Sequence, residues 1–268
     1  MTRVHHESYL RRIGLDPDRV NDPDRSTVER LQRAHVFAVP FETLAITGDP
    51  FGDHEGEGVS LVVPELYEKV IERGQGGFCF ELNGLFGWLL ADLGVEFDRV
   101  AAVVLDGDEA RTPANHMAYV CSFDRRYVVD VGLGVPTMRQ PIPLDGEARV
   151  DEAGVEWRVA ESERPDANYV TQFRKPDDDD WTDRYVFRDV HRERSFFEAT
   201  CEYLATAPES PFTDSPVATL ATDRGHLKLS GTTLTEVVDT EERERELDAD
   251  EWYDVLEREF DLGFRPRE

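Results

Sequence analysis

The sequence predicts an α+β protein in which helices come first, strands follow and a mixed segment ends the chain. Two observations support this order. Up to about residue 95, apolar residues recur three and four positions apart, which is typical of helices. Beyond that point, short segments rich in Val, Ala and Tyr are separated by turns, which is typical of strands. Because helices and strands do not alternate regularly, we do not expect a parallel βαβ winding.

Four helices are expected in the first part of the chain, at residues 9–15, 26–37, 63–72 and 79–93. Ser26 or Thr27 is expected to cap the second helix. The fourth helix is strongly apolar, because one stripe along it consists of Leu82, Leu85, Phe86, Leu89, Leu90 and Leu93. Residues 39–42 are expected to be extended. Residues 48–60, dominated by Gly, Asp and Glu, are expected to form a loop.

The middle of the chain is expected to consist mainly of strands. The first three lie at residues 97–105, 116–123 and 127–131, with a tight turn at 124–126 that makes a hairpin of the second and third. Further strands with the same composition are expected at residues 155–159, 169–173, 185–187, 218–222, 226–230 and 233–238. Two more helices are expected at residues 195–204 and 248–260. A helical part, a β part and a C-terminal lid would then share one catalytic cleft.

The charge balance excludes several classes of partner. The 268 residues include 57 acidic and 30 basic side chains, which gives a net charge of −27. Such a chain repels phosphate backbones and anionic membrane surfaces, so we expect neither nucleic acid nor a membrane as a partner. Only three of the basic residues are lysines: Lys69, Lys175 and Lys228. An acidic, lysine-poor surface favours a halophilic origin, where high salt screens the self-repulsion; an ordinary acidic cytosolic protein is the alternative.

The cysteines and the N-terminal segment favour a cytoplasmic location. The three cysteines, Cys79, Cys121 and Cys201, are odd in number and widely spaced, which argues against a disulfide framework and a zinc site. The first sixteen residues contain seven charged or histidine side chains and no apolar stretch of signal-peptide length. The longest uncharged apolar run of the central region, at 82–91, is too short to span a bilayer.

Cys79 is the candidate nucleophile. It follows the glycine-rich turn 74–77 and opens the apolar helix. At a helix N-terminus the macrodipole and unpaired backbone N–H groups favour a thiolate, so we expect a lowered pKa for this thiol. The same N–H groups are placed to stabilise an oxyanion, and the glycines would leave room for a substrate carbonyl. The alternative is that Cys79 is simply a small buried apolar residue, as free cysteines commonly are.

A base and its orienting partner are expected on the predicted hairpin. His116 begins one strand and Asp130 ends the next, so both lie near the open end of the hairpin and can face each other. Taken singly, His116 is also explained as a half-buried packing residue and Asp130 as a strand-end turn former. The remaining histidines are expected to be surface or packing residues: His5, His6, His35, His54, His191 and His226.

Residues 73–83, Arg-Gly-Gln-Gly-Gly-Phe-Cys-Phe-Glu-Leu-Asn, closely resemble the cysteine motif of the arylamine N-acetyltransferases. Other segments resemble landmarks of that family in the same order. They are the opening helix at 9–15, Pro-Phe-Glu-Thr at 40–43, Asn-His-Met at 115–117, Asp-Val-Gly-Leu-Gly at 130–134, Ser-Pro-Phe at 210–212 and Gly-Thr-Thr-Leu-Thr at 231–235. The resemblance covers nearly the whole chain, from about residue 9 to 262.

The resemblance implies a fold, an activity and a set of site residues. The fold would be a helical bundle at 1–95, a β-barrel at 96–195 and an α/β lid at 196–268, related to papain-like and transglutaminase-like cysteine enzymes. The activity would be transfer of an acetyl group from acetyl-CoA to an aromatic amine, hydrazine or hydroxylamine, without a metal. Cys79 would carry the acetyl group, His116 would act as the base and Asp130 would orient it. Ping-pong kinetics follow from such a covalent intermediate.

The resemblance also assigns the acceptor pocket and shows departures from the family pattern. Phe41, Leu133 and Phe212 would line the pocket, because aromatic substrates need flat apolar walls. Leu133 replaces the usual Phe, and Thr43 replaces the usual Asn. Gln75 replaces an Arg that pairs, in the family, with the residue matching Glu42. A buried lone carboxylate is costly, so we expect Arg73 or Gln75 to contact Glu42 instead.

Four other functions remain open from the sequence. A macrolactam-forming amide synthase has the same triad and motif but takes its acyl chain from a polyketide carrier. A cysteine hydrolase or transglutaminase-like enzyme would discharge the acyl group to water or act on peptide amides. A binding module that retains the fold is the third alternative, but it would not need Cys79, His116 and Asp130 to be intact. A metal site made of these three residues is the fourth alternative, but their spacing in the sequence matches no common zinc-ligand pattern.

Overall fold

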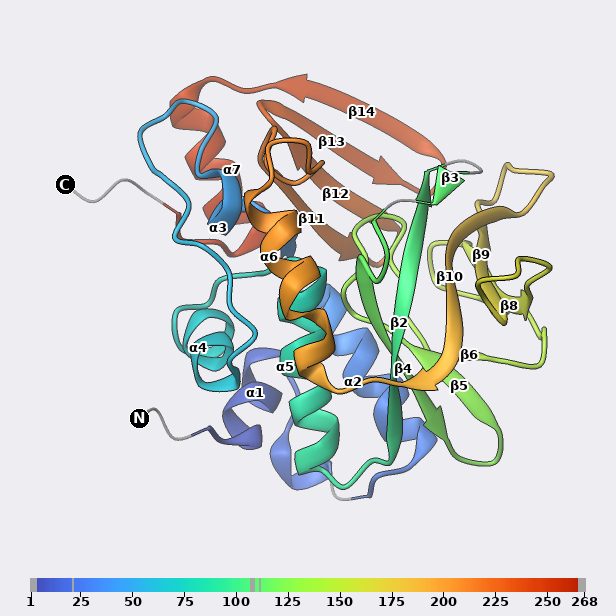
Figure 1. The fold of residues 1–268 in the computed structure, drawn as a ribbon. Coiled ribbons are helices and arrows are strands. Elements are labelled where there is room, and N and C mark those ends of the chain that lie inside the picture. The colour runs from blue at the N-terminus through green and yellow to red at the C-terminus, as the bar shows by residue number, and fades with distance from the viewer. Residues whose placement is uncertain (1–3, 21, 107–108, 111, 265–268) are drawn as a thin grey trace.

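The computed structural model describes residues 4–20, 22–106, 109–110 and 112–264. Figure 1 shows a group of helices from the first part of the chain, a strongly curved sheet beside it, and a second sheet that crosses the top of the molecule. The helices-first order expected from the sequence is therefore confirmed. The ends of two expected ranges, residues 1–3 and 265–268, lie outside the described residues.

The helical part contains α1 (His6–Arg12), α2 (Arg25–Ala38), α3 (Leu44–Thr47), α4 (Val63–Tyr67) and α5 (Cys79–Asp92), with a one-turn 3₁₀ helix at Pro17–Arg19. α4 continues as a wider helical turn over Glu68–Glu72, which completes the helix expected at 63–72. The cap expected for α2 is wrong: Asp24 caps this helix, and its carboxylate accepts the N–H of Thr27 at 2.7 Å. A carboxylate fills this place well, because it is charged and faces the positive end of the helix.

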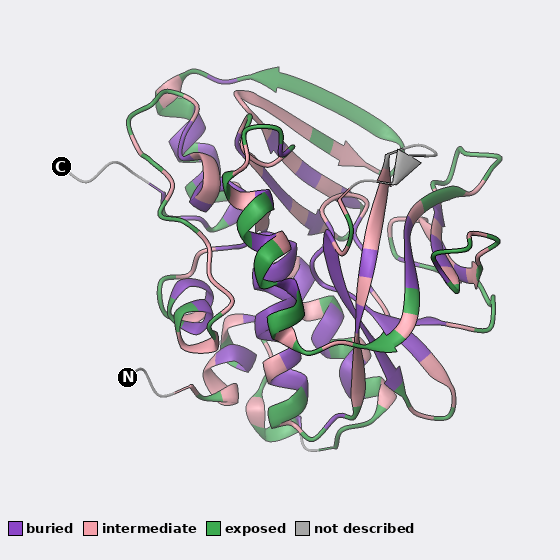
Figure 2. Ribbon diagram, viewed as in Figure 1, coloured by how far each residue is buried: buried purple, intermediate pink, exposed green. Residues whose placement is uncertain are grey.

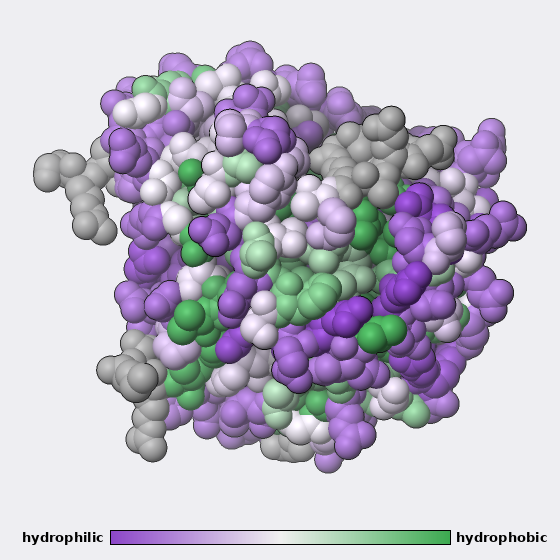
Figure 3. Space-filling model, in the orientation of Figure 1, coloured by the Kyte–Doolittle hydropathy of each residue, from purple (hydrophilic) through white to green (hydrophobic). Residues whose placement is uncertain are grey.

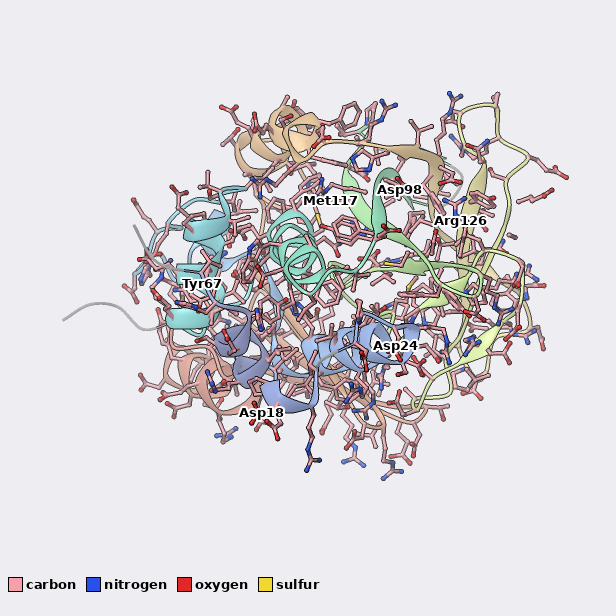
Figure 4. The ribbon with its side chains drawn as sticks, turned by 90° about the horizontal axis from the view of Figure 1, so that it is seen from below. Asp18, Asp24, Tyr67, Asp98, Met117 and Arg126 are labelled. Carbon is pink, nitrogen blue, oxygen red and sulfur yellow. The ribbon has the colours of Figure 1, made fainter. Side chains whose placement is uncertain are left out.

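α5 is the centre of the helical part. Most of its side chains are buried, including all the predicted apolar stripe except Leu93, which lies beyond the last helical residue and is partly buried. The stripe packs against α1, α2 and α4 and, on its other side, against β4. Figure 4 shows α5 beside the strand that carries Met117. Because most of α5 is buried, including its first turn, its first residue is held in a fixed place.

The curved sheet has the strand order β6-β5-β4-β2-β10-β9-β8-β7, and β3 pairs with β2. Its strands are β2 (Phe97–Asp106), β3 (Glu109–Ala110), β4 (His116–Ser122), β5 (Arg126–Val129), β6 (Ile142–Pro143), β7 (Arg149–Val150), β8 (Glu156–Glu161), β9 (Tyr169–Arg174) and β10 (Thr182–His191). β6 also contacts β8, so the sheet curls into a nearly closed barrel. The barrel has its own apolar core, which includes Trp157, Tyr185 and Leu133.

The hairpin that carries the predicted base and its partner is confirmed. β4 and β5 pair antiparallel, with Ser122 opposite Arg126 at the turn and Tyr119 opposite Val129 toward the open end. Ion pairs hold the outer side of this sheet, where Arg126 contacts Asp98 at 3.9 Å and also Asp189 (Figure 4). β10 is much longer than the expected strand at 185–187, because it pairs with both β2 and β9 along its length.

The second sheet has the order β1-β11-β12-β13-β14 and is covered on one face by α7 (Ala249–Phe260). Its strands are β1 (Phe41–Glu42), β11 (Val217–Thr222), β12 (Gly225–Ser230), β13 (Thr233–Val238) and β14 (Glu241–Glu246). β1 comes from the helical part and pairs with β11, with Phe41 opposite Thr219. β14 was not expected from the sequence; its side chains are all exposed, so it shows no apolar alternation (Figure 2).

α6 (Glu198–Thr206), preceded by a 3₁₀ turn at Arg194–Phe197, joins the barrel to the second sheet. Its inner face packs on the helical core through Phe197, Cys201 and Leu204. The ring of Phe197 lies 5.7 Å from that of Phe80, next to the first residue of α5. All three parts of the fold therefore meet around the start of α5.

Candidate active site

Cys79 is held at the start of α5 by a loop that lies directly against β1. The N–H of Glu42 donates to the carbonyl of Gly77 at 2.9 Å, and the N–H of Gly77 donates to the carbonyl of Pro40 at 3.3 Å. A Cβ on Gly76 would lie 2.3 Å from the carbonyl oxygen of Pro40, so only glycine permits this approach. The glycines were expected to let the chain turn sharply and to leave room for a substrate carbonyl; Gly76 admits the backbone of Pro40, directly before β1.

The turn after Asp130 packs on Cys79 from the other side. A Cβ on Gly132 would lie 2.7 Å from the carbonyl oxygen of Cys79 and 2.4 Å from Nδ2 of Asn83. Gly132 therefore allows backbone-to-backbone contact between the hairpin and the helix. This contact brings Asp130 and His116 to the same end of α5 as Cys79.

His116 and Asp130 form a buried hydrogen-bonded pair, as the sequence predicts. His116 Nε2 lies 2.7 Å from Asp130 Oδ2, and both side chains are almost wholly inaccessible to solvent. The second carboxylate oxygen, Oδ1, accepts the N–H of Gly132 at 2.9 Å and Nδ2 of Asn83 at 2.9 Å. Because Nε2 is engaged with Asp130, the imidazole nitrogen that remains for proton exchange is Nδ1.

Asn83 and Gln32 are two site residues that the sequence reasoning missed. Asn83 lies one helical turn after Cys79, and its amide also donates to the carbonyl of Met117 at 2.6 Å and accepts the N–H of Val131 at 3.1 Å. Gln32 on α2 donates to the backbone carbonyls of Asp130 at 3.2 Å and Met138 at 2.9 Å. A polar residue four positions after Cys79, inside an otherwise apolar helix, was the available signal for Asn83.

The expectation of a lowered pKa for the Cys79 thiol is wrong. Burial raises its pKa well above the ordinary value, and the nearby Cys201 and Asp130 add to this effect. The backbone N–H of Phe80, in the first turn of α5, acts in the opposite direction but is outweighed. The thiol also lies 3.8 Å from the carbonyl oxygen of Asn115. A thiolate here therefore requires a positive charge beside it.

A cavity of about 330 Å³ opens onto Cys79 and His116. Phe41, Leu133 and Phe212, the three residues assigned to the acceptor pocket, all line this cavity. The rings of Phe41 and Phe212 lie 6.4 Å apart, and the ring of Phe78 meets that of Phe212 edge-on at 6.0 Å. Asp130 lies behind His116 and is not part of the cavity wall.

The partner expected for Glu42 is also wrong. Arg73 pairs with Glu57 at 2.5 Å, and no hydrogen bond joins Gln75 and Glu42 among the described residues. Instead Lys69 Nζ lies 3.1 Å from Glu42 Oε1 and 2.7 Å from Glu81 Oε2, with all three side chains buried. Thr43, the other departure in this segment, accepts the N–H of Val217 through Oγ1 at 2.9 Å, which fastens β1 to β11.

The buried cluster of Lys69, Glu42 and Glu81 supports the start of α5. Burial acts to lower the pKa of Lys69, but the two carboxylates outweigh it and raise this pKa above its ordinary value. Burial raises the pKa of Glu81, against the opposing effect of Lys69. Oε2 of Glu81 also accepts the N–H of Phe78 at 3.3 Å, and Oε2 of Glu42 accepts the N–H of Ala45 at 3.2 Å.

Within the part of the chain that the structure describes, no group of three or more His, Cys, Asp or Glu side chains is arranged to hold a metal ion. No helix among the described residues is long and apolar enough to cross a membrane. Of the remaining histidines, His35 is buried and bonds the hydroxyl of Tyr9 at 2.7 Å, and burial lowers its pKa to about 3.

A cysteine at a buried helix start beside a histidine–carboxylate pair is the arrangement of enzymes that form acyl-cysteine intermediates. Comparisons identify the family. The sequence model of the N-acetyltransferase family matches residues 24–267. The arylamine N-acetyltransferase of Mycolicibacterium smegmatis is 32% identical over 233 residues, which covers 84% of this chain and 80% of that protein. The chain therefore belongs to the arylamine N-acetyltransferase family, whose members are acyltransferases.

Solved structures agree with this assignment. The arylamine N-acetyltransferase of Salmonella typhimurium superposes with a TM-score of 0.85 at 25% identity, covering 99% of this chain and 93% of that one. An arylamine N-acetyltransferase of Bacillus cereus, described as having a unique Cys-His-Glu triad, superposes with a TM-score of 0.86 at 21% identity, covering 98% and 99%. These neighbours show the expected combination of helical bundle, barrel and α/β segment.

Proposed function

We propose that the protein transfers the acetyl group of acetyl-CoA to an aromatic amine, hydrazine or hydroxylamine through an acetyl-Cys79 intermediate. Cys79 is the nucleophile, His116 the general base and acid, and Asp130 the group that orients His116. The observation that carries the proposal is the 2.7 Å bond between His116 and Asp130 at the same cavity as Cys79, in a chain of this family.

The first half-reaction acylates the enzyme. The Cys79 proton passes to Nδ1 of His116, and the thiolate attacks the carbonyl carbon of the acetyl thioester. The bond between that carbon and the CoA sulfur breaks, and the CoA sulfur takes the proton from His116. Between these two transfers His116 carries a positive charge. The Asp130 carboxylate stabilises this charge, because it lies in a short, buried hydrogen bond with His116.

The second half-reaction discharges the acetyl group. The acceptor nitrogen attacks the carbonyl carbon of acetyl-Cys79, and the bond to the Cys79 sulfur breaks. His116 takes the proton that the amine loses, and Cys79 leaves as the thiolate. Phe41, Leu133 and Phe212 hold the aromatic ring of the acceptor, because flat apolar walls suit it.

Initial-rate kinetics test this proposal. We expect parallel lines in double-reciprocal plots when acetyl-CoA is varied at several concentrations of an aromatic amine, because CoA leaves before the amine reacts. Intersecting lines would mean a ternary complex and would refute the covalent route. Release of CoA at the same rate with and without amine would indicate a hydrolase.

We also propose that the enzyme works in the cytoplasm of a salt-rich cell and has neither nucleic acid nor a membrane as a partner. The net charge of −27, the scarcity of lysine and the three free, buried cysteines support this setting. Loss of the folded state on dialysis from concentrated to dilute KCl, followed by circular dichroism, would support the halophilic part; full stability in dilute buffer would contradict it. The catalytic unit would comprise 1–95, 96–195 and 196–268.

A further inference from the structure

Lys228 is the one lysine on the wall of the Cys79 cavity, among the residues that the structure describes. The chain contains only two other lysines. Lys69 is buried between two carboxylates, and Lys175 is exposed and lines the neighbouring cavity instead. Of the described side chains, Lys228 is therefore the only primary amine that shares a cavity with the proposed nucleophile.

The second sheet turns Lys228 toward this cavity. Its neighbours Leu227 and Leu229 pack against α7, so Lys228 lies on the opposite face of β12. On that face Lys228 lies opposite Thr219 of β11, which in turn lies opposite Phe41 of β1. All three residues of this row line the Cys79 cavity.

The same row leads to Cys79. Phe41 pairs with Gly77, two residues before Cys79. Neighbouring strands are about 4.8 Å apart, so the backbone of Lys228 lies roughly 10 Å from that of Phe41. A lysine side chain carries its amine on a flexible four-carbon stem, which spans much of this distance. The cavity has a volume of only about 330 Å³, so a group attached to Cys79 lies within reach of that amine.

The amine of Lys228 is not held by another charge. It is half-buried and makes no ion pair with any residue that the structure describes. Lys228 also lines the neighbouring cavity, which has several carboxylates in its wall, but none of those described lies within ion-pair distance. The amine can therefore turn toward a thioester on Cys79 without breaking a salt bridge.

Proximity overcomes the protonation of a lysine. Near pH 7.4 only about one ordinary lysine side chain in a thousand is neutral and able to attack a carbonyl carbon. Two groups held in one site react with effective molarities of about 10⁵ M or more when they are well oriented. This gain exceeds the loss from protonation even where the orientation is far from ideal.

We propose that Lys228 is a self-acetylation site, which takes the acetyl group of acetyl-Cys79 when no aromatic acceptor is present. The ammonium group first gives one proton to solvent, and the neutral nitrogen attacks the carbonyl carbon. The bond from that carbon to the Cys79 sulfur breaks, and its electron pair stays on sulfur. The second proton passes from the nitrogen through His116 to the sulfur, which leaves an amide on Lys228 and a free thiol at Cys79. This inference rests on the proposed function, because the acetyl group comes from acetyl-Cys79.

An aromatic acceptor protects Lys228, because the two amines compete for the same acetyl group. An acceptor that empties Cys79 quickly leaves little acetyl-Cys79 for Lys228. Without an acceptor the modified lysine accumulates, since an amide does not transfer its acetyl group as a thioester does. The acetyl group then fills part of the cavity, so an enzyme left with acetyl-CoA alone loses activity.

Peptide mapping by mass spectrometry tests the inference. The protein is kept for hours with acetyl-CoA and no amine, and is then treated with neutral hydroxylamine, which removes a thioester but not an amide. The acetyl groups that remain are located in the unaltered protein, Cys79→Ala and Lys228→Arg. Lys175 is the internal control, because an exposed lysine reports direct reaction with acetyl-CoA from solution.

We expect acetyl-Lys228 in at least about tenfold excess over acetyl-Lys175, because transfer within one cavity is faster than reaction from solution. The excess should disappear in Cys79→Ala, and also when an aromatic amine is present throughout. Lys228→Arg should still form acetyl-Cys79 but gain no hydroxylamine-resistant acetyl group at residue 228. The unaltered protein should lose activity in step with the modification, whereas Lys228→Arg should keep its own starting activity.

Two results would overturn the inference. They are acetyl-Cys79 that forms while Lys228 stays unmodified, and equal acetylation of Lys228 in the unaltered protein and Cys79→Ala. If acetyl-CoA does not acetylate Cys79, the proposed function fails, and p-nitrophenyl acetate, an activated ester that acylates thiols directly, replaces it as the donor. Acetylation of Lys228 from this ester that depends on Cys79 would support the inference; its absence would refute it.

Discussion

Replacing Lys69 by methionine tests the role of the buried cluster beneath the active site. Lys69 is the positive charge that faces both Glu42, at 3.1 Å, and Glu81, at 2.7 Å. Methionine has nearly the same length but no charge, so two buried carboxylates are left together. Breaking a buried ion pair by removing one partner costs about 3–5 kcal/mol. We expect the free energy of unfolding to fall by about that amount at pH 7.5.

The pH dependence gives this prediction its sign. Burial already raises the pKa of Glu81, and without Lys69 the folded-state pKa of Glu81 rises further above its unfolded value. A carboxyl with a raised folded pKa stabilises the fold when it is protonated, and that stability is lost as the pH rises through the folded pKa. The deficit of Lys69→Met relative to the unaltered protein should therefore be largest at pH 7.5 and shrink toward pH 5.

The assay is urea unfolding at fixed KCl, followed by tryptophan fluorescence. Lys175→Met is the matched control, because Lys175 is exposed, and it should change the free energy of unfolding by less than about 0.5 kcal/mol. Adding Glu42→Gln and Glu81→Gln to Lys69→Met should recover much of the lost stability, since no buried charge then remains. A loss below about 1 kcal/mol, or a deficit that does not depend on pH, would refute the reasoning.

Three further predictions concern the proposed catalytic residues and the glycine that packs against the start of α5. Asp130→Asn should keep the fold but slow acetyl transfer about 10³-fold or more, because an amide at this place favours the His116 tautomer that cannot take the Cys79 proton; a normal rate in a stopped-flow assay would contradict this. In His116→Gln, alkylation of Cys79 by iodoacetamide should be at least about tenfold slower at pH 7 and rise steadily with pH, since burial raises the pKa of the thiol; the same pH profile as the unaltered protein would show that His116 does not stabilise the thiolate. Gly132→Ala should cost about 1–3 kcal/mol of stability, because its Cβ would lie 2.4 Å from Nδ2 of Asn83, whereas Gly134→Ala, whose nearest contact would be 3.7 Å, should cost little; equal melting temperatures for the two variants would contradict the close packing.

The parts of the site that the sequence predicts correctly depend on local signals. The apolar stripe of α5 fixes where that helix begins, and so places Cys79 at its N-terminus. A short polar turn at 124–126 sets the hairpin, which is enough to bring His116 and Asp130 to one end. These features depend on residues that are close together in sequence, so the pattern of apolar and polar residues is enough to predict them.

The parts that the sequence does not predict depend on contacts between distant segments. Lys69 reaches Glu42 and Glu81 only because α4 packs beside α5, and no spacing in the sequence encodes that approach. The pairing of β1 with β11 joins residues far apart along the chain. β14 forms from a run of charged residues because its backbone pairs with β13, while its side chains stay in solvent.

The pKa of Cys79 shows how a local rule is overridden. A helix N-terminus favours the thiolate, and the N–H of Phe80 does act in that direction. Burial opposes it and is the larger effect, because α5 lies in the centre of the helical core, beneath α6 (Figure 1). Figure 3 shows a mostly hydrophilic outer face, with apolar residues gathered near the middle of the view. The sequence shows where the helix begins but not how deeply it is buried.

Intact-mass spectrometry of the protein in concentrated KCl tests the acetyl-Cys79 intermediate most directly. The protein is mixed with acetyl-CoA alone and then with an aromatic amine. We predict a gain of one acetyl group that is absent in Cys79→Ala and lost when the amine is added, with appearance of the acetylated amine. A folded protein that gains no acetyl group, or gains it equally in Cys79→Ala, would contradict the account.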